Sequence, residues 1–212
     1  MGIAIGIYDF FSHAIPGGVV VAAILYLLQR DLLLSTNHTS LSVQLLIILG
    51  TLSYILGYVL DPFSLFWYRI FSPKNHHKKV IEDLDKNLLS VEINLQDIDW
   101  YTLLAFVKRN NMHMSQDVER FNVTSIMLRK VSLGMLIFAF IFSFEFIFIN
   151  RLPMLVFLGV FCLVTSIVLI KESVKFKSWF YAAIYQSVAA LVAEPKNLPV
   201  KFKSALLQIV GQ

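Results

Sequence analysis

The fold is decided by residues 131–170, which read VSLGMLIFAFIFSFEFIFINRLPMLVFLGVFCLVTSIVLI. Two apolar runs, Val131–Ile149 and Leu152–Ile170, lie on either side of Asn150-Arg151. About 20 apolar residues in a helix cross the roughly 30 Å hydrocarbon core of a bilayer. Each run therefore predicts a transmembrane helix, and the short polar separation predicts that the two form a tight helical hairpin.

Two further runs before this hairpin have the same character: Phe11–Leu28, and Leu41–Leu60 with an aromatic extension to Tyr68. Of the 212 residues, 57% are hydrophobic and 15% charged, whereas soluble domains average about 45–50% and about 25%. A soluble chain of this size could not hide so much apolar surface, but a bilayer removes the need. The first run lacks a basic start and a cleavage-like site, so we interpret it as a retained span.

The distribution of Lys and Arg predicts the orientation of the four spans. Both termini and the segment between the second and third spans must share one side. That side carries 16 of the 18 basic residues, and the other side carries only Arg30 and Arg151. Because cytoplasmic loops are enriched in Lys and Arg, we expect a multi-pass protein of the bacterial inner membrane with cytoplasmic N- and C-termini.

The sequence thus predicts an all-α membrane protein with four transmembrane helices, a helical cytoplasmic segment between helices 2 and 3, and an amphipathic C-terminal helix. Residues 1–71 hold transmembrane helices 1 and 2, and residues 72–130 form the cytoplasmic helical segment. Residues 131–170 form the transmembrane hairpin of helices 3 and 4. Residues 171–212 form a cytoplasmic amphipathic tail.

The cytoplasmic segment is short and charged, and its periodicity indicates three helices. The first covers His77–Leu89. The second starts near Asp97, a plausible N-cap, and stops at Asn110-Asn111. The third starts at Ser115 and runs unbroken into the third span, over about 35 residues or about 50 Å. The stretch Val91–Leu95 alternates and can also be interpreted as a short strand.

The tail keeps helical periodicity from Lys171 to Ala193, and Pro195 breaks it before a second amphipathic piece, Phe202–Val210. One face of the tail helix is apolar. This face can pack on the helices of residues 77–125, lie on anionic lipid, or dock a partner protein. The residues expected to contact a partner or lipid are Trp179, Phe180, Lys175, Lys177, Trp100 and Arg120.

Ionisable groups within or beside spans are candidates for function, because burying a charge in hydrocarbon costs several kcal/mol. Asp9 and His13 lie one helical turn apart at the start of the first span, and Asp61 ends the second span on the same membrane side. These three groups can form a cluster near Arg69. Such a cluster is either a polar network that fixes helix packing or a proton relay or gate.

Glu145 is a second candidate, because it lies inside the third span among four phenylalanines. It is about 7 Å from the outer end of the helix by helical rise. In an oligomer, a ring of Glu145 side chains could line a cation-selective pore. Pairing with Arg151 or Arg30 is the alternative.

Small residues mark candidate sites of helix packing. Pro16, Gly17 and Gly18 predict a break or kink early in the first span, where glycines let another backbone approach closely. Gly57 is the candidate site of close helix packing in the second span. The Pro-Gly-Gly stretch is interpreted as a hinge or a tight helix crossing, and an unwound entry to the membrane is the alternative.

The sequence carries no pattern typical of an enzyme, such as a Gly-rich phosphate loop or a His-Glu-x-x-His helix. We therefore expect no catalysis, no cofactor and no metal. The one cysteine, Cys162, cannot form an intrachain disulfide. In residues 72–130 the basic side chains interleave with eight acidic ones, which argues against direct nucleic-acid binding.

Three short sequence segments follow one another in an order that is found in a known family. They are Tyr8-Asp9-Phe10-Phe11 followed by Pro16-Gly17, then Tyr54-Ile55-Leu56-Gly57-Tyr58 with Asp61, and last Arg120-Phe121-Asn122. In this layout the chain resembles small four-helix transmembrane effector proteins of bacterial anti-phage defence systems. The resemblance implies a subunit that oligomerises and perturbs the membrane when a cytoplasmic sensor triggers it, as in abortive infection. It carries over no catalytic residue, and the matching positions are Asp9, Pro16, Gly17, Gly57, Asp61 and Arg120.

The leading hypothesis is therefore a non-enzymatic membrane effector that forms a homo-oligomer in the bilayer. A cytoplasmic sensor protein would trigger it, and its output would be a pore or another loss of the membrane barrier. The alternative is a membrane anchor or scaffold subunit that recruits a soluble partner. A small ion-coupled transporter ranks last, because the two pairs of spans do not resemble each other and the one Pro/Gly break lies near an end.

Overall fold

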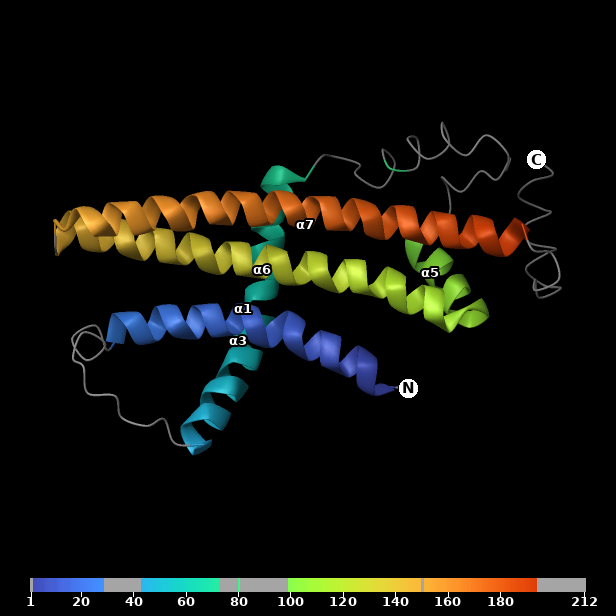
Figure 1. The fold of residues 1–212 in the computed structure, drawn as a ribbon, viewed down its shortest axis with the longest axis horizontal. Coiled ribbons are helices and arrows are strands. Elements are labelled where there is room, and N and C mark those ends of the chain that lie inside the picture. The colour runs from blue at the N-terminus through green and yellow to red at the C-terminus, as the bar shows by residue number, and fades with distance from the viewer. Residues whose placement is uncertain (1, 29–42, 73–79, 81–98, 150, 194–212) are drawn as a thin grey trace. The chain divides into compact units, whose positions relative to one another are not determined.

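The computed structural model describes residues 2–28, 43–72, 80, 99–149 and 151–193. Every element in these ranges is an α-helix (Figure 1). The helices are α1 (Gly2–Leu28), α3 (Val43–Phe71), α5 (Trp100–Asn110), α6 (Met112–Phe148) and α7 (Pro153–Ala193).

Four of these helices, α1, α3, α6 and α7, are long and apolar enough to cross a membrane. The all-α fold with four spanning helices, predicted from the apolar runs, is confirmed, and the chain is a multi-pass membrane protein. The helix that contains the third span is unbroken, as predicted, but it begins at Met112 and not at Ser115, and it has 37 residues. The fourth span continues without a break to Ala193, so the amphipathic tail helix is an extension of that span.

The start of α5 corrects one predicted boundary. We expected the helix to begin near Asp97, but its N-cap is Asp99, whose backbone is extended. The carbonyl of Asp99 accepts the first hydrogen bonds, from the amides of Thr102 and Leu103 at 3.0 and 3.2 Å. The Asp99 side chain makes no capping hydrogen bond, so the backbone alone fixes this helix start.

The predicted stop at Asn110-Asn111 is confirmed, because α5 ends at Asn110 and α6 begins at Met112. Asn111 forms hydrogen bonds with the end of α5 and with the start of α6. Its amide donates to the carbonyl of Val107 at 2.8 Å, and its side-chain oxygen accepts from the amide of Met114 at 3.1 Å. Side-chain oxygens before a helix satisfy first-turn amides that lack a partner within the helix. Apart from Val80, which is helical, the predicted helix His77–Leu89 lies outside the described residues. So do the predicted strand Val91–Leu95 and the piece Phe202–Val210.

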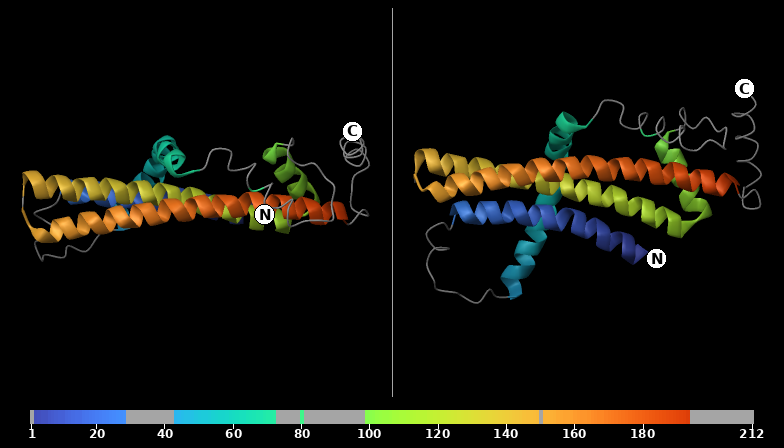
Figure 2. Two further views of the ribbon diagram at one scale, coloured as in Figure 1. Left: turned by 90° about the horizontal axis from the view of Figure 1, so that it is seen from above. Right: turned by 45° about the horizontal axis from the view of Figure 1, so that its top comes forward.

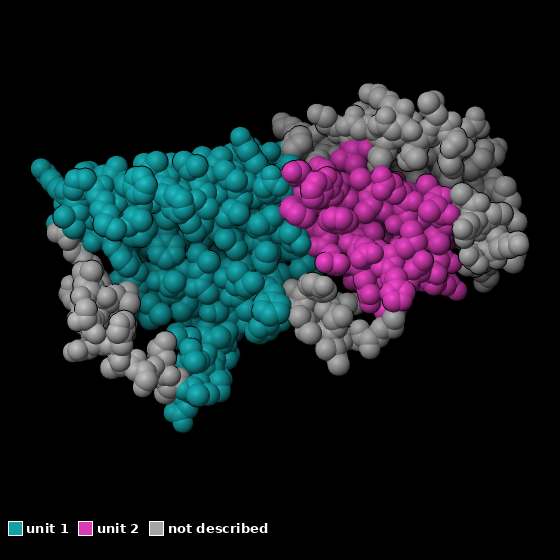
Figure 3. All heavy atoms as spheres, viewed as in Figure 1, with its two compact units in different colours: residues 1–72, 123–174 teal, residues 73–122, 175–212 magenta. Residues whose placement is uncertain are grey.

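The chain divides into two compact units (Figure 3). Unit 1 comprises Met1–Ser72 and Val123–Val174, and unit 2 comprises Pro73–Asn122 and Lys175–Gln212. Within unit 1, α6 and α7 lie side by side in both views of Figure 2. Their antiparallel course is that of the predicted hairpin.

Pairs of serines join the two helices of the hairpin. The hydroxyls of Ser125 and Ser173 each donate to the other residue's carbonyl at 2.8 Å. Ser132 and Ser166 repeat the arrangement with the same distances. The pairs are seven residues apart on each helix, the spacing that keeps one seam facing a partner helix. Small residues let two helix backbones approach closely in lipid, so these serines set the seam of the hairpin.

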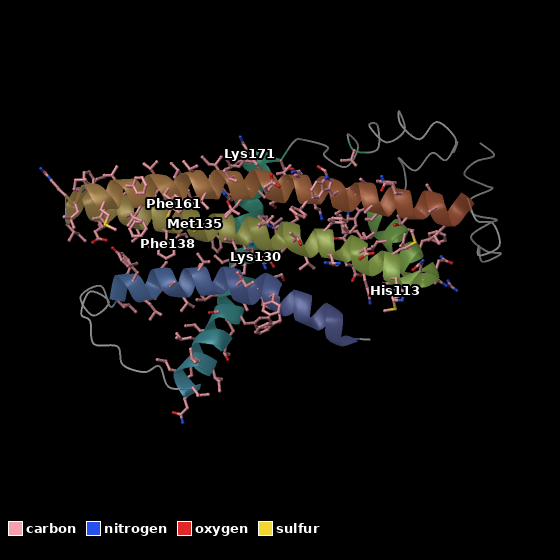
Figure 4. The ribbon with its side chains drawn as sticks, viewed as in Figure 1. His113, Lys130, Met135, Phe138, Phe161 and Lys171 are labelled. Carbon is pink, nitrogen blue, oxygen red and sulfur yellow. The ribbon has the colours of Figure 1, made fainter. Side chains whose placement is uncertain are left out.

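A second cluster of unit 1 is apolar and lies farther along the hairpin. Its buried members are Ala139, Phe142, Leu155 and Cys162. Tyr26 of α1 packs against it, together with Met135 and Phe138 of α6, which are labelled in Figure 4. This cluster attaches the end of α1 to the hairpin.

Unit 2 has a hydrophobic core of its own. The apolar face of the tail helix packs on α5 and on the first turns of α6, one of the three uses that the sequence left open. The eight buried side chains are Leu103, Phe106, Val107, Val118, Phe180, Ile184, Tyr185 and Val188.

Candidate functional site

Asp61 is the centre of a charge cluster built by three helices of unit 1. One carboxylate oxygen lies 3.1 Å from Nη2 of Arg129 and 3.1 Å from Nζ of Lys130, both on α6. The other carboxylate oxygen lies 3.8 Å from Nε2 of His13 on α1. Lys130 lies on α6 where α1 and α3 cross in the view of Figure 4. One acidic group of α3 thus joins α3 to both neighbouring helices.

The cations of this cluster are removed from solvent. The side chain of Lys130 is 0% exposed and that of Arg129 is 12% exposed, while the Asp61 carboxylate is 37% exposed. Both cations precede the third span directly, so they lie at one end of the membrane-crossing part of α6. A charge at such a place persists when it has a counter-charge, because an unpaired buried charge is strongly unfavourable.

Hydrogen bonds and ring contacts hold the cluster in position. Nε of Arg129 donates to the hydroxyl of Ser64 at 3.1 Å, and that hydroxyl donates to the carbonyl of Asp61 at 2.9 Å. The ring of His13 stacks on Tyr58, with centroids 3.8 Å apart. Arg129 is therefore held at its Nε by Ser64 and at its Nη2 by Asp61, which fixes the plane of the guanidinium group.

The structure brings together two of the residues proposed from the sequence, Asp61 and His13, but with other cations than expected. Arg69 was the expected neighbour, yet it is exposed. On a helix, Arg69 lies more than two turns beyond Asp61, whereas Arg129 and Lys130 face α3 from the adjacent helix. Arg129 and Lys130 could have been identified from the sequence as a pair of basic residues immediately before an apolar run. Asp9 belongs to α1, and its side chain lies outside the described part.

The small residues proposed for helix packing lie where α1 crosses α3. A Cβ atom added at Gly17 would overlap the carbonyl oxygen of Ser53, and one added at Gly57 would overlap the carbonyl oxygen of His13. The packing at Gly18 is less tight, because a Cβ atom added there would lie 3.8 Å from its nearest neighbour, the Ser53 hydroxyl. The helix α1 continues through Pro16, so the Pro-Gly-Gly stretch neither ends the helix nor unwinds it.

Glu145 is buried inside unit 1, with 6% of the residue exposed. Its Oε2 accepts a hydrogen bond of 2.6 Å from the hydroxyl of Tyr26 on α1. The expected partner was Arg151 or Arg30, whereas the structure places the hydroxyl of Tyr26 against the Glu145 carboxylate. In this arrangement the carboxylate ties α1 to α6 within one chain, whereas a pore ring would require it on a surface shared between copies.

This contact gives a prediction for Tyr26→Phe. The variant should lose about 1.5–3 kcal/mol of stability, because a buried carboxylate loses its hydroxyl donor. Unfolding in mixed micelles, followed by circular dichroism, measures the change. Tyr54→Phe is the matched control, since the hydroxyl of Tyr54 contacts only the exposed hydroxyl of Tyr58 among the contacts described for it, at 3.2 Å. Equal losses in the two variants would refute the structural role of the Tyr26–Glu145 contact.

The residues proposed for partner or lipid contact lie in unit 2, and most of them contact one another. Nζ of Lys177 lies 5.2 Å from the ring centre of Trp100 and 4.3 Å from that of Phe180, and it donates to Oδ1 of Asn122 at 2.7 Å. Lys177 therefore ties α7 to α5 and α6 through cation–π and hydrogen-bond contacts. This lysine, Trp100 and the fully buried Phe180 contribute to the core of the unit.

Three other residues of that group are accessible. The ammonium group of Lys175 lies 5.0 Å from the ring centre of Trp179, and both side chains are exposed. Arg120 pairs with Asp117 at 3.7 Å on the surface of α6. Lys175, Trp179 and Arg120 are thus the members of the proposed contact set that unit 2 presents to its surroundings.

The arrangement around Asp61 is suited to holding helices together. Among the described residues, no group of three or more His, Cys, Asp and Glu side chains could hold a metal ion. The cluster joins the Asp61 carboxylate on α3 to the buried Lys130 and the half-buried Arg129 on α6. No protein-family model, curated protein or solved structure matches this chain.

Proposed function

We propose that the chain is a membrane effector whose spans associate with further copies and disturb the membrane when a cytoplasmic partner acts on it. The observation that carries this proposal is the attachment of α3. This helix is held by the Asp61 cluster, by the Gly17 and Gly57 crossing, and by a hydrogen bond of 3.0 Å from the indole of Trp67 to Ser132. The rest of α3 is largely exposed.

The burial of the four spans supports this reading. Of the most apolar stretch of α3, 17% is buried, against 33% for α1. Apolar side chains gain little from leaving lipid for another helix, so polar contacts and close packing decide whether spanning helices stay together. When the polar contacts around Asp61 are lost, α3 becomes free to pack elsewhere. A second copy of the chain then offers an equivalent surface.

The trigger would act from the side that carries the basic residues. Arg129 and Lys130 belong to the same helix as residues 112–122 of unit 2. A partner that binds unit 2 would bias the equilibrium by the difference in its affinity for the two states. The charge distribution supports cytoplasmic termini in a bacterial inner membrane, and the resemblance in layout supports a role in anti-phage defence.

A leak assay on reconstituted protein tests this proposal. Asp61→Asn should release an encapsulated dye from phosphatidylglycerol vesicles at least tenfold faster than the unaltered chain, because each loss of about 1.4 kcal/mol of stabilisation shifts such an equilibrium tenfold. Asp117→Asn is the matched control, since Asp117 and Arg120 form an exposed pair, 74% and 60% accessible. Equal dye release from all three proteins would contradict the proposal.

The second candidate function is a membrane anchor that recruits a soluble protein. The compact core of unit 2 and its exposed Trp179, Lys175 and Arg120 favour it. Under this reading, neutral substitutions at Asp61 and Glu145 leave function intact, while deletion of residues 171–212 abolishes it. The two candidates therefore differ in the dye-release result for Asp61→Asn.

A further inference from the structure

A groove of about 380 Å³ lies between α6 and α7 in unit 1, apart from the charge cluster. Its floor is formed by Ala139 and Gly159, and exposed apolar side chains such as Phe140 and Val160 border it. The one hydroxyl that lines it, of Ser143, donates to the carbonyl of Ala139 at 2.8 Å within its own helix. The groove therefore offers an apolar surface to whatever occupies it.

Gly159 is the one glycine among the residues that line the groove. A Cβ atom at this position would meet only ordinary van der Waals neighbours, the nearest being the Ser143 hydroxyl at 3.5 Å and Cβ of Phe142 at 3.6 Å. The helices therefore do not need glycine here in order to pack, unlike at Gly17 and Gly57. Gly159 thus lines the groove without adding a side chain to it.

The length and position of the groove match one leaflet of a bilayer. Along α6 it extends from Leu136 to Ile147, which is about 17 Å at 1.5 Å per residue. Half of a roughly 30 Å hydrocarbon core is about 15 Å. The groove ends close to the connection between α6 and α7, where Arg151 is exposed.

We propose that this groove binds one acyl chain of a phospholipid whose phosphate pairs with Arg151. Within a membrane the groove faces lipid and not water, and dispersion contacts favour filling it. Arg151 supplies the charge that a phosphate requires, at the end of the groove where the headgroup lies. A second copy packed symmetrically on this face would bring the two Arg151 side chains to the same membrane level, where their charges repel.

Native mass spectrometry of the protein released from phosphatidylglycerol nanodiscs tests this inference. The unaltered chain should retain one phospholipid. Gly159→Leu, which fills the groove, should reduce retention about tenfold, because the loss of apolar contact for two or more CH₂ groups is sufficient for this change. Gly50→Leu is the matched control, since a side chain at Gly50 on α3 would meet nothing within 4 Å, and it should retain lipid as the unaltered chain does.

Arg151→Gln provides an independent variant, because Arg151 lies in the exposed connection and not in a packed helix. It should reduce retention about threefold, as expected for the loss of one exposed ion pair. Lipid retention by Gly159→Leu equal to that by Gly50→Leu would overturn the inference. So would a lipid-free dimer of the unaltered chain that becomes monomeric in Gly159→Leu, because that result assigns the groove to a second copy.

Discussion

Asp61→Asn will lower the stability of the protein in mixed micelles by about 3 kcal/mol. Breaking a buried ion pair costs about 3–5 kcal/mol, because the remaining charge stays buried without compensation. The lower part of this range applies because the Asp61 side chain is 37% exposed. Arg129 and Lys130 lose the carboxylate that lies 3.1 Å from each of them. Reversible unfolding followed by circular dichroism provides the measurement.

The control for this prediction is Asp117→Asn. Its partner, Arg120, lies 3.7 Å away on an exposed helix surface, where an ion pair contributes about 0–1 kcal/mol. Both variants remove one carboxylate from the same protein, so the difference between them isolates the effect of the buried environment. A change of less than about 1 kcal/mol in Asp61→Asn would show that the cluster does not hold α3.

The second large effect is expected at the crossing of α1 and α3. Gly57→Ala should destabilise the protein by about 3 kcal/mol, because the new methyl group overlaps the backbone of His13 and forces the helices apart. The overlapping atoms of His13 belong to the backbone, which cannot change rotamer to relieve the overlap as a side chain can. The same unfolding experiment measures this loss.

Gly50→Ala is the control on the same helix, because a Cβ atom there meets nothing within 4 Å. Alanine is a better helix former than glycine by about 1 kcal/mol, so this variant should be neutral or slightly stabilising. If Gly57→Ala were as stable as Gly50→Ala, the close crossing of α1 and α3 would not exist in the membrane.

The helices themselves could be predicted from the sequence because their signals are local. An apolar run of about 20 residues identifies a span without knowledge of its neighbours, and Asn110-Asn111 marks a helix end by its own chemistry. The boundary at Asp99 was missed by two residues, because two aspartates in Asp97-Ile98-Asp99 are equally suited to cap a helix and only the backbone decides between them.

The contacts between helices could be predicted only in part. Asp61, His13 and Glu145 could be identified because ionisable groups in or beside apolar runs are conspicuous. Their partners could not, because Arg129 and Lys130 lie far from Asp61 in the sequence, and Tyr26 lies far from Glu145. Which face of a helix meets which neighbour depends on the rotation of each helix in the bundle, and a single sequence does not specify it. The serine pairs carried a usable signal, the seven-residue spacing of Ser125 and Ser132, which recurs in Ser166 and Ser173.

The bundle illustrates how a membrane protein distributes its polar contacts. The serine pairs of the hairpin satisfy their own hydroxyls reciprocally, so α6 and α7 form a stable frame. The attachment of α3 to the hairpin instead depends on the charged groups around Asp61 and on the Trp67–Ser132 hydrogen bond, while its close crossing at Gly57 joins it to α1. In the proposed switch, loss of the contacts between α3 and the hairpin would separate two states that differ by only a few kcal/mol.

The most direct test of the account is the distance between α3 and the hairpin, measured together with leakage. Spin labels at Phe66→Cys and Val168→Cys, two exposed positions, in a Cys162→Ser background report this distance by pulsed electron paramagnetic resonance in vesicles. The account predicts one narrow distance distribution for the otherwise unaltered chain and for Asp117→Asn, and a broader, longer one for Asp61→Asn, which also leaks dye. An unchanged distance distribution in an Asp61→Asn protein that leaks, or a broadened one in a protein that does not leak, would contradict it.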